Sequence, residues 1–333
     1  MPTVSEFELY SQQLHDQYQR KKTKLRISLT DRCNFKCSYC MPDHPTWLAK
    51  KEILSFEELY LFCETMVKLG IQQIRLTGGE PLMRKGVSHF IERLNQLRAL
   101  GLSRISMTTN AYYLAEYAAD LKQAGLDDLN ISLDSIRPET FFNMTKKPLQ
   151  PVLAGIAAAQ QANIPIKINC VLLQGENSDE ILELVQWAYQ QQIELRFIEY
   201  MPLDQPEQWQ REKVVIEDEI LAQLAPHFQI DSIPRKNDPA THYLLNQTFK
   251  LGVISTISKP FCESCDRLRL TATGELFTCL FANTGTPIRH LLAVGQQQTL
   301  ITQILTTVWH KKAGYIAHQA APLRKITMHA IGG

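Results

Sequence analysis

Three cysteines in the first part of the chain, Cys33, Cys37 and Cys40, have the spacing of a metal-binding loop. A closed structural zinc site takes four protein ligands, and so does an iron–sulfur cluster that only transfers electrons. Three thiolates leave one metal position without a nearby protein ligand, and a small molecule can bind and react there. The sequence therefore predicts a reactive metal site in this loop.

A second group of three cysteines, Cys262, Cys265 and Cys279, lies in the last third of the chain. The segment between Cys265 and Cys279 alternates as a hairpin would, with Gly274 as a plausible turn residue. Read from the residues alone, this group is either a second open metal site or a structural zinc knuckle.

Two further cysteines could in principle complete the second group. We expect Cys63 in a helix and Cys170 in a strand to be small buried hydrophobic residues instead. Arg267 and Arg269, which follow Cys265 closely, suit an anionic substrate beside an open iron better than a zinc site.

Alternating apolar segments predict the elements that must position these residues. Strands are expected near 24–29, 72–77, 104–109, 128–133, 165–173 and 194–199, separated by helices. This order predicts an α/β fold with six βα units, a partial TIM-type barrel. A C-terminal extension that contains β-structure is expected to cover the open side. The first three cysteines would follow a strand's C-terminal end, where such folds place their chemistry.

The predicted organisation has three parts. Residues 1–23 form an N-terminal segment in which Arg20–Lys22 is expected to be a solvated basic run. Residues 24–203 form the partial barrel, and residues 204–333 form a C-terminal domain with the second cysteine group and a Gly-Gly tail.

Composition excludes several classes of function. The formal net charge is +1, so no overall charge favours nucleic acid or a membrane surface. No apolar run is long enough for a membrane span, and no secretory signal is expected. Six of the eight cysteines are clustered, which favours reduced metal-binding thiols in a cytoplasmic protein over disulfides.

Five cations are expected to meet in one cavity. Arg26, Arg75 and Lys167 lie in predicted strands of the barrel, and Arg267 and Arg269 lie in the C-terminal part. Pairs of arginine and phosphate suit a triphosphate, because each guanidinium can donate two parallel hydrogen bonds. The alternative for each residue alone is a salt bridge at the rim of the barrel.

On these residues the chain resembles the radical S-adenosylmethionine superfamily and, within it, the GTP 3′,8-cyclase family of molybdenum cofactor biosynthesis. The resemblance is strongest over 24–42, 75–83, 196–202, 261–281 and 326–333. It implies two [4Fe–4S] clusters, one on each cysteine group, and S-adenosyl-L-methionine bound to the first.

The resemblance also implies roles for individual residues. It implies cofactor contacts by Tyr39, Gly79, Ser132 and Met201. It implies GTP contacts by Arg26, Arg75, Thr108, Lys167, Arg267 and Arg269. It implies catalytic participation of Arg267, Arg269, Gly332 and Gly333.

The implied reaction converts GTP to (8S)-3′,8-cyclo-7,8-dihydroguanosine 5′-triphosphate. A 5′-deoxyadenosyl radical would abstract the ribose 3′ hydrogen, and the substrate radical would attack guanine C8. Implied partners are a one-electron reductant such as flavodoxin or ferredoxin, a downstream cyclic pyranopterin monophosphate synthase and a second copy in a homodimer. Two alternatives stay open: a two-cluster radical enzyme that modifies a peptide, and a zinc-binding or electron-transfer module without catalysis.

One position departs from the family pattern. Ala111 stands where the family usually has glycine after the third strand. If this position has a positive φ, the alanine is strained.

Overall fold

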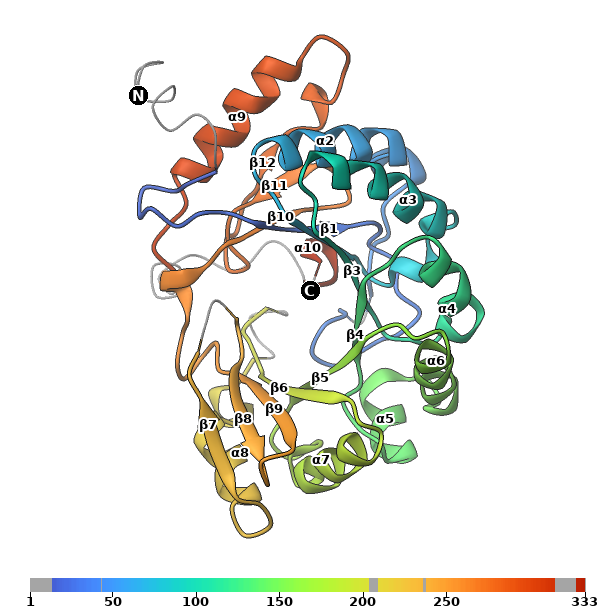
Figure 1. Ribbon diagram of the computed structural model, residues 1–333, viewed down its shortest axis with the longest axis vertical. Helices are drawn as coiled ribbons and strands as arrows, with labels where there is room; N and C mark the ends of the chain where they lie inside the picture. Colours follow the sequence, from blue (N-terminus) through green and yellow to red (C-terminus); the bar gives the residue numbers. More distant parts are fainter. Residues whose placement is uncertain (1–13, 43, 204–208, 236–237, 315–327, 333) are drawn as a thin grey trace.

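Eight parallel strands form one curved sheet that wraps around a central space (Figure 1). The computed structural model describes residues 14–42, 44–203, 209–235, 238–314 and 328–332. The eight strands are, in order across the sheet, β10 (Arg267–Leu270), β1 (Lys24–Ser28), β2 (Gln73–Thr77), β3 (Arg104–Thr109), β4 (Asp128–Ser132), β5 (Ile166–Leu172), β6 (Glu194–Glu199) and β9 (Phe249–Ile254).

Antiparallel strands extend the sheet at both ends. They are β11 (Glu275–Phe277) and β12 (Thr286–Pro287) beyond β10, and β8 (Thr241–Leu245) and β7 (Ile230–Ile233) beyond β9. The sheet is not closed by hydrogen bonds between its two ends. The predicted partial barrel with six βα units and a C-terminal β-containing extension is therefore confirmed. The extension does more than cover the opening, because it adds a parallel strand to each side of the barrel.

Helices cover the convex face of the sheet (Figure 1). They are α2 (Phe56–Lys68), α3 (Val87–Leu94), α4 (Leu114–Gln123), α5 (Pro138–Thr145), α6 (Gln150–Gln161) and α7 (Ile181–Gln190). Helix α2 begins with a capping box, in which the Ser55 hydroxyl accepts from the Glu58 amide and the Glu58 carboxylate accepts from the Ser55 amide. Two further helices, α8 (Glu217–Leu224) and α9 (Gln297–Trp309), belong to the C-terminal part. The described helices include none long and apolar enough to cross a membrane.

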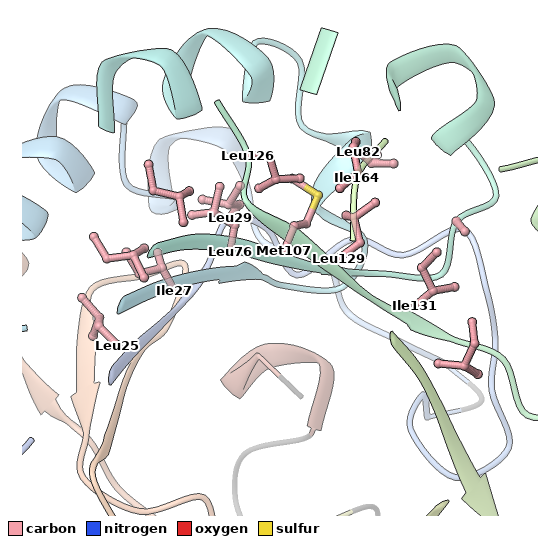
Figure 2. Packing of buried hydrophobic residues seen from close by; sticks show 14 of the residues in the cluster. Leu25, Ile27, Leu29, Leu76, Leu82, Met107, Leu126, Leu129, Ile131 and Ile164 are labelled. Atoms are coloured by element: carbon pink, nitrogen blue, oxygen red, sulfur yellow. The ribbon is translucent and has the colours of Figure 1, made fainter. Parts of the chain in front are cut away.

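The core lies between the strands and the outer helices. Leu25 and Ile27 of β1, Leu76 of β2 and Met107 of β3 point toward the helices (Figure 2). Because side chains alternate along a strand, the intervening residues face the concave side. On β1 to β6 and β10 these intervening residues are mostly polar or charged. The interior of this barrel is therefore built for a polar ligand rather than for hydrophobic packing.

Of two further predictions from the sequence, the one for Cys63 and Cys170 is confirmed and the one for Arg20–Lys22 is wrong. Cys63 and Cys170 are fully buried in the core, as predicted. The prediction of a solvated basic run at Arg20–Lys22 is wrong for its two ends, because Arg20 is buried and Lys22 is completely buried. Both side chains bind Asp16, which is also completely buried. Buried cations of this kind are stable only when they are paired and hydrogen-bonded.

Candidate active site

The concave side of the sheet encloses a cavity of about 290 Å³. This volume is close to the lower end of the range for small-molecule pockets. We call it the substrate cavity. Its walls include every residue for which a GTP contact was predicted: Arg26, Arg75, Thr108, Lys167, Arg267 and Arg269.

Three arginines form a row across the floor of the substrate cavity. Strand register places Arg26 directly between Arg269 of β10 and Arg75 of β2. Like charges opposite one another on adjacent strands are destabilising. Removal from bulk water and the charges of the neighbouring arginines lower the pKa of Arg26 well below its usual value. A bound anion would relieve the repulsion within this arginine row.

One end of this row has an acidic neighbour among the described residues. The Arg75 guanidinium lies 3.8 Å from the Asp128 carboxylate, which also binds Arg104 at 2.5 Å. Within the described residues, three buried atoms in the cavity wall lack a hydrogen-bond partner: Nη1 of Arg75 and the side-chain oxygens of Asn130 and Asn169. A donor and two acceptors thus face the cavity, and buried polar groups of this kind call for a polar ligand.

The second cysteine group lies in the wall of the same cavity. Cys262 and Cys265 flank a single helical turn, and the β10–β11 hairpin returns the chain to Cys279. Gly274 has a φ of 87° at the turn, as its predicted role requires. Burial raises the pKa of the Cys265 thiol, but the positive charges of Arg267, Lys311 and Lys22 outweigh it and lower this pKa to about 6. The surroundings therefore favour a thiolate.

The first cysteine group lines a second, smaller cavity of about 110 Å³, here called the cofactor cavity. Cys33, Cys37 and Cys40 follow the end of β1, as predicted. Burial and the Glu80 carboxylate raise the pKa of the Cys33 thiol to about 12. Burial also raises the pKa of Cys37, with the charges of Cys40 and Asp134 as further causes. The surroundings of Cys33 and Cys37 therefore favour the neutral thiol when no cation is bound.

The segment Gly78–Glu80 fastens the first cysteine loop to β2. The amides of Gly79 and Glu80 donate to the carbonyls of Thr30 and Arg32, at 2.7 and 2.8 Å. A Cβ atom at Gly79 would lie 2.2 Å from the Arg32 oxygen, so only glycine fits there. The predicted cofactor residue Gly79 lines the cofactor cavity, and it also has this packing requirement.

Tyr39 and Asp134 stand where the two cavities adjoin, because both residues line both walls. The Tyr39 hydroxyl donates to the Asp134 carboxylate at 2.7 Å, and the Val171 amide donates to its other oxygen at 2.8 Å. Burial raises the pKa of Asp134 to about 6. Of the other two predicted cofactor residues, Ser132 lines both cavities and Met201 lines the substrate cavity.

The spacing of the three cysteines in each group suits an iron–sulfur cluster better than a single metal ion. All six are free cysteines. Across the described residues, no three His, Cys, Asp or Glu side chains lie close enough together to bind one metal ion. A zinc site needs that closeness because its ligands share one ion at about 2.0–2.3 Å. A cubane cluster does not, because its thiolates bind different irons.

The C-terminal tail reaches the arginine row. Helix α10 (Met328–Ile331) lies inside the barrel, on the side of the sheet away from the outer helices (Figures 1 and 2). Arg269 donates to the Gly332 carbonyl at 2.6 Å. Gly332 has a φ of 76°, and a Cβ atom there would lie 2.4 Å from the Thr77 hydroxyl. The predicted catalytic residue Gly333 lies outside the described residues.

Ala111 has a φ of 61°, so the strain expected of an alanine at this position is present. Sequence reasoning missed several polar residues of the cavity walls. These are Ser106, Asn130, Asp134, Asn169 and Arg196. All but Asp134 lie on the strands themselves, and the period-two alternation of each strand could have indicated them.

Comparison with known proteins gives two matching family models and a set of close relatives. Residues 27–188 match the Radical SAM superfamily, and residues 193–317 match Molybdenum Cofactor Synthesis C. A GTP 3′,8-cyclase of Streptomyces coelicolor is 43% identical over 310 residues, which cover 90% of each chain. A GTP 3′,8-cyclase of Brucella ovis is 38% identical over 301 residues, covering 89% of this chain and 88% of the relative.

Solved structures share the fold at low sequence identity. Streptococcus suis SuiB bound to its precursor peptide SuiA matches with a TM-score of 0.62 and 12% identity, over 93% of this chain and 68% of SuiB. The protein anSMEcpe with bound AdoMet and a peptide matches with a TM-score of 0.55 and 14% identity, over 85% and 84%. At these identities the likeness concerns the fold alone.

Proposed function

The chain belongs to the GTP 3′,8-cyclase family of radical S-adenosylmethionine enzymes, and on that premise we propose that it converts GTP to (8S)-3′,8-cyclo-7,8-dihydroguanosine 5′-triphosphate. This product would begin molybdopterin biosynthesis. One observation carries the proposal. Two groups of three thiols line adjoining cavities, and a row of three arginines lies across the floor of the larger one.

Each cysteine group would hold a [4Fe–4S] cluster through three thiolates. Cys33, Cys37 and Cys40 would hold the one that binds S-adenosylmethionine, and Cys262, Cys265 and Cys279 the one that faces the substrate. When bound, the first cluster and the cofactor would supply a 5′-deoxyadenosyl radical that takes hydrogen from the ribose C3′. Bonding of this carbon to guanine C8 would then take up one electron, from the reductant, and one proton to give the 7,8-dihydro product. The protein's own contribution is to bind, orient and exclude water.

The arginine row would bind the triphosphate. A triphosphate carries about four negative charges at neutral pH and accepts bidentate hydrogen bonds from guanidinium groups. Lys167, Thr108 and Arg267 would add contacts from other walls of the same cavity. With the phosphates held at the floor of the substrate cavity, the nucleoside would be confined between the first and the second cysteine group. That confinement converts the reaction of two bound molecules into an effectively unimolecular step.

Tyr39, whose hydroxyl donates to Asp134, would contact the cofactor where the two cavities adjoin. Ser132 and Met201 would contact the cofactor from the same junction, and Gly79 from the end of β2. The hydrogen bond from Arg269 to the Gly332 carbonyl holds the C-terminal tail beside the substrate cavity. We propose that Gly332 and Gly333 complete the cavity around the bound nucleotide.

The remaining partners are also proposals. A one-electron reductant such as flavodoxin or ferredoxin would supply the first cluster. A cyclic pyranopterin monophosphate synthase would consume the product, and the chain would form a homodimer. We further propose a cytoplasmic location and the division into residues 1–23, 24–203 and 204–333.

The decisive experiment is anaerobic reconstitution with iron and sulfide, followed by incubation with GTP, S-adenosylmethionine and a reductant. We expect about eight irons per chain, because each cluster holds four, and formation of 5′-deoxyadenosine with the cyclised nucleotide. ATP in place of GTP is the control and should give no cyclised product. Recovery of only four irons per chain, or no 5′-deoxyadenosine, would overturn the proposal.

A further inference from the structure

The N-terminal hairpin, residues 14–22, is built around one buried carboxylate. Its two arms meet in an antiparallel bridge between His15 and Lys21. One oxygen of Asp16 accepts from the amides of Tyr18 and Arg20, at 3.0 and 3.1 Å. The other oxygen accepts from Arg20 Nε and Lys22 Nζ, both at 2.7 Å. Asp16 thus closes the turn and also fixes two cations.

Both cations extend from Asp16 to the second cysteine group. Arg20 donates to the carbonyl of Cys262 at 2.8 Å, and Lys22 donates to the carbonyl of Cys265 at 2.7 Å. A third buried cation, Lys311, donates to the carbonyl of Thr278, the residue before Cys279. Each segment that bears a thiol is therefore held by a different buried cation.

The same contacts tie the chain's beginning to the segment after α9. Arg20 also donates to the carbonyls of Lys312 and Ala313. Gly314 follows directly, and a Cβ atom there would lie 2.3 Å from Cβ of Cys262. The segment after α9 is thus held against the second cysteine group from one side, and the N-terminal hairpin holds both.

The three cations around the second cysteine group also make its surroundings positively charged. Arg20, Lys22 and Lys311 carry three positive charges, and among the described residues Asp16 is the carboxylate that pairs with Arg20 and Lys22. Burying an ammonium group is unfavourable unless a partner compensates for the lost hydration. Three thiolates and the cluster they bind would be such a partner, because electrostatic interactions are strong where water is excluded.

We propose that the N-terminal hairpin and Lys311 form a cationic clamp that positions the three thiols of the second site and stabilises the negative charge of the cluster bound there. The inference rests on the proposed function, which places a [4Fe–4S] cluster on these thiols. Asp16, Arg20, Lys22 and Lys311 are positioning residues, since they act through the cysteine backbone.

The first test uses metal-free protein, so that it is independent of catalysis and of cluster loading. In Lys22→Met, amide hydrogen exchange should accelerate about tenfold across 261–266, because a charge-assisted hydrogen bond to the Cys265 carbonyl is lost. Exchange across the first cysteine loop, 33–41, should stay unchanged. Equal acceleration in both loops, or in neither, would overturn the clamp.

Arg289 provides a matched control. It donates to the Glu58 carboxylate at 3.1 Å and to the carbonyls of Lys51 and Glu52, the bonding pattern of Arg20 at a place without thiols. Arg289→Met should leave exchange in the second cysteine group as in wild type, whereas Arg20→Met should accelerate it. If Lys22→Met does not fold, the Asp16→Asn/Lys22→Met double variant removes the carboxylate together with its ammonium partner.

The second test uses reconstituted protein. Lys22→Met should lose iron from the second site, from about eight toward about four per chain, while equilibrium binding of S-adenosylmethionine stays unchanged. Any second cluster that remains should have a lower reduction potential, because a positive charge that favours its reduced form is gone. Wild-type iron content together with a wild-type potential would contradict the clamp. If the wild type itself holds only four irons, the proposed function fails, and hydrogen exchange still decides the clamp.

Discussion

The two cysteine groups differ in how the chain assembles them. Cys33, Cys37 and Cys40 lie in one continuous loop after β1, held by the neighbouring backbone of Gly79 and Glu80. The second group joins two segments of the C-terminal part, and its supports come from residues 14–22 and 311–314. A local loop thus makes the first site, and contacts between the two ends of the chain make the second.

The electrostatic surroundings of the two cysteine groups also differ. Burial and the Glu80 carboxylate raise the pKa of Cys33 to about 12, whereas burial at Cys265 is outweighed by cations that lower its pKa to about 6. A site with few compensating charges depends on its bound metal for thiolate formation. The second site is already electropositive. The comparison indicates that the two sites should respond differently to the loss of one residue.

Replacing a cysteine should have the largest effect and should separate the two sites. Cys37→Ser should abolish binding of S-adenosylmethionine, because the first cluster is lost. Cys265→Ser should keep cofactor binding and cleavage but form no cyclised nucleotide. Each variant should retain about four irons per chain. Iron analysis with a cofactor-binding assay checks this, and loss of cofactor binding in both variants would show that the sites are not independent.

The arginine row should serve the substrate and neither cluster. Arg26→Met should weaken GTP binding about 10- to 100-fold, the effect of losing a charged hydrogen-bonding partner. The same change removes the middle of three like charges, so the repulsion that this residue adds to the ligand-free protein is also lost. Calorimetric titration and thermal unfolding measure the two effects. Unchanged GTP affinity with lower stability would make Arg26 a structural residue.

Two glycines offer a matched pair for the backbone supports. A Cβ atom at Gly79 would meet the Arg32 oxygen at 2.2 Å, and one at Gly314 would meet Cβ of Cys262 at 2.3 Å. Gly79→Ala should disturb only the first site, and Gly314→Ala only the second, each at about 1–3 kcal/mol of overpacking. Cofactor binding and iron content distinguish the outcomes. The same loss from both variants would contradict separate support of the two sites.

Asp134 should give the ligand-free protein a pH-dependent stability between about pH 4 and 7. Its pKa rises from 3.8 in the unfolded chain to about 6 in the fold, so the native state binds more protons between these values. The protonation of Asp134 therefore adds to the free energy of unfolding. This added stability is fully present below pH 4 and is lost as the pH rises through 6. Asp134→Asn should therefore remove a fall in stability of about 2–3 kcal/mol between pH 4 and 7. Identical pH profiles of unfolding for variant and wild type would remove Asp134 from this account.

Most of the fold could be predicted because its pattern is local. The six barrel strands differ from their predicted ranges by one residue at most at either end, since most of each strand alternates between apolar and polar residues. The parallel pairing of β9 and β10 with the barrel could not be predicted, because it depends on contacts between distant segments. The residues predicted for GTP, Arg26 and Arg75 among them, do line one cavity.

The supports of the second site could not be predicted, and the reason is physical. Arg20 and Lys22 resemble any solvated basic pair until Asp16 and the cysteine carbonyls surround them. Their partners lie 242 and 243 residues away along the chain. A single sequence carries no local pattern for such contacts. The strand alternation, in contrast, did carry the information for Asn130 and Asn169.

The most direct test follows a single hydrogen from GTP. Reconstituted protein would be incubated with a reductant, S-adenosylmethionine and GTP that carries deuterium at the ribose C3′. If the two cysteine groups act on one bound GTP, deuterium should appear in 5′-deoxyadenosine in step with the cyclised nucleotide. Unlabelled 5′-deoxyadenosine, with the deuterium still in GTP, would contradict the account.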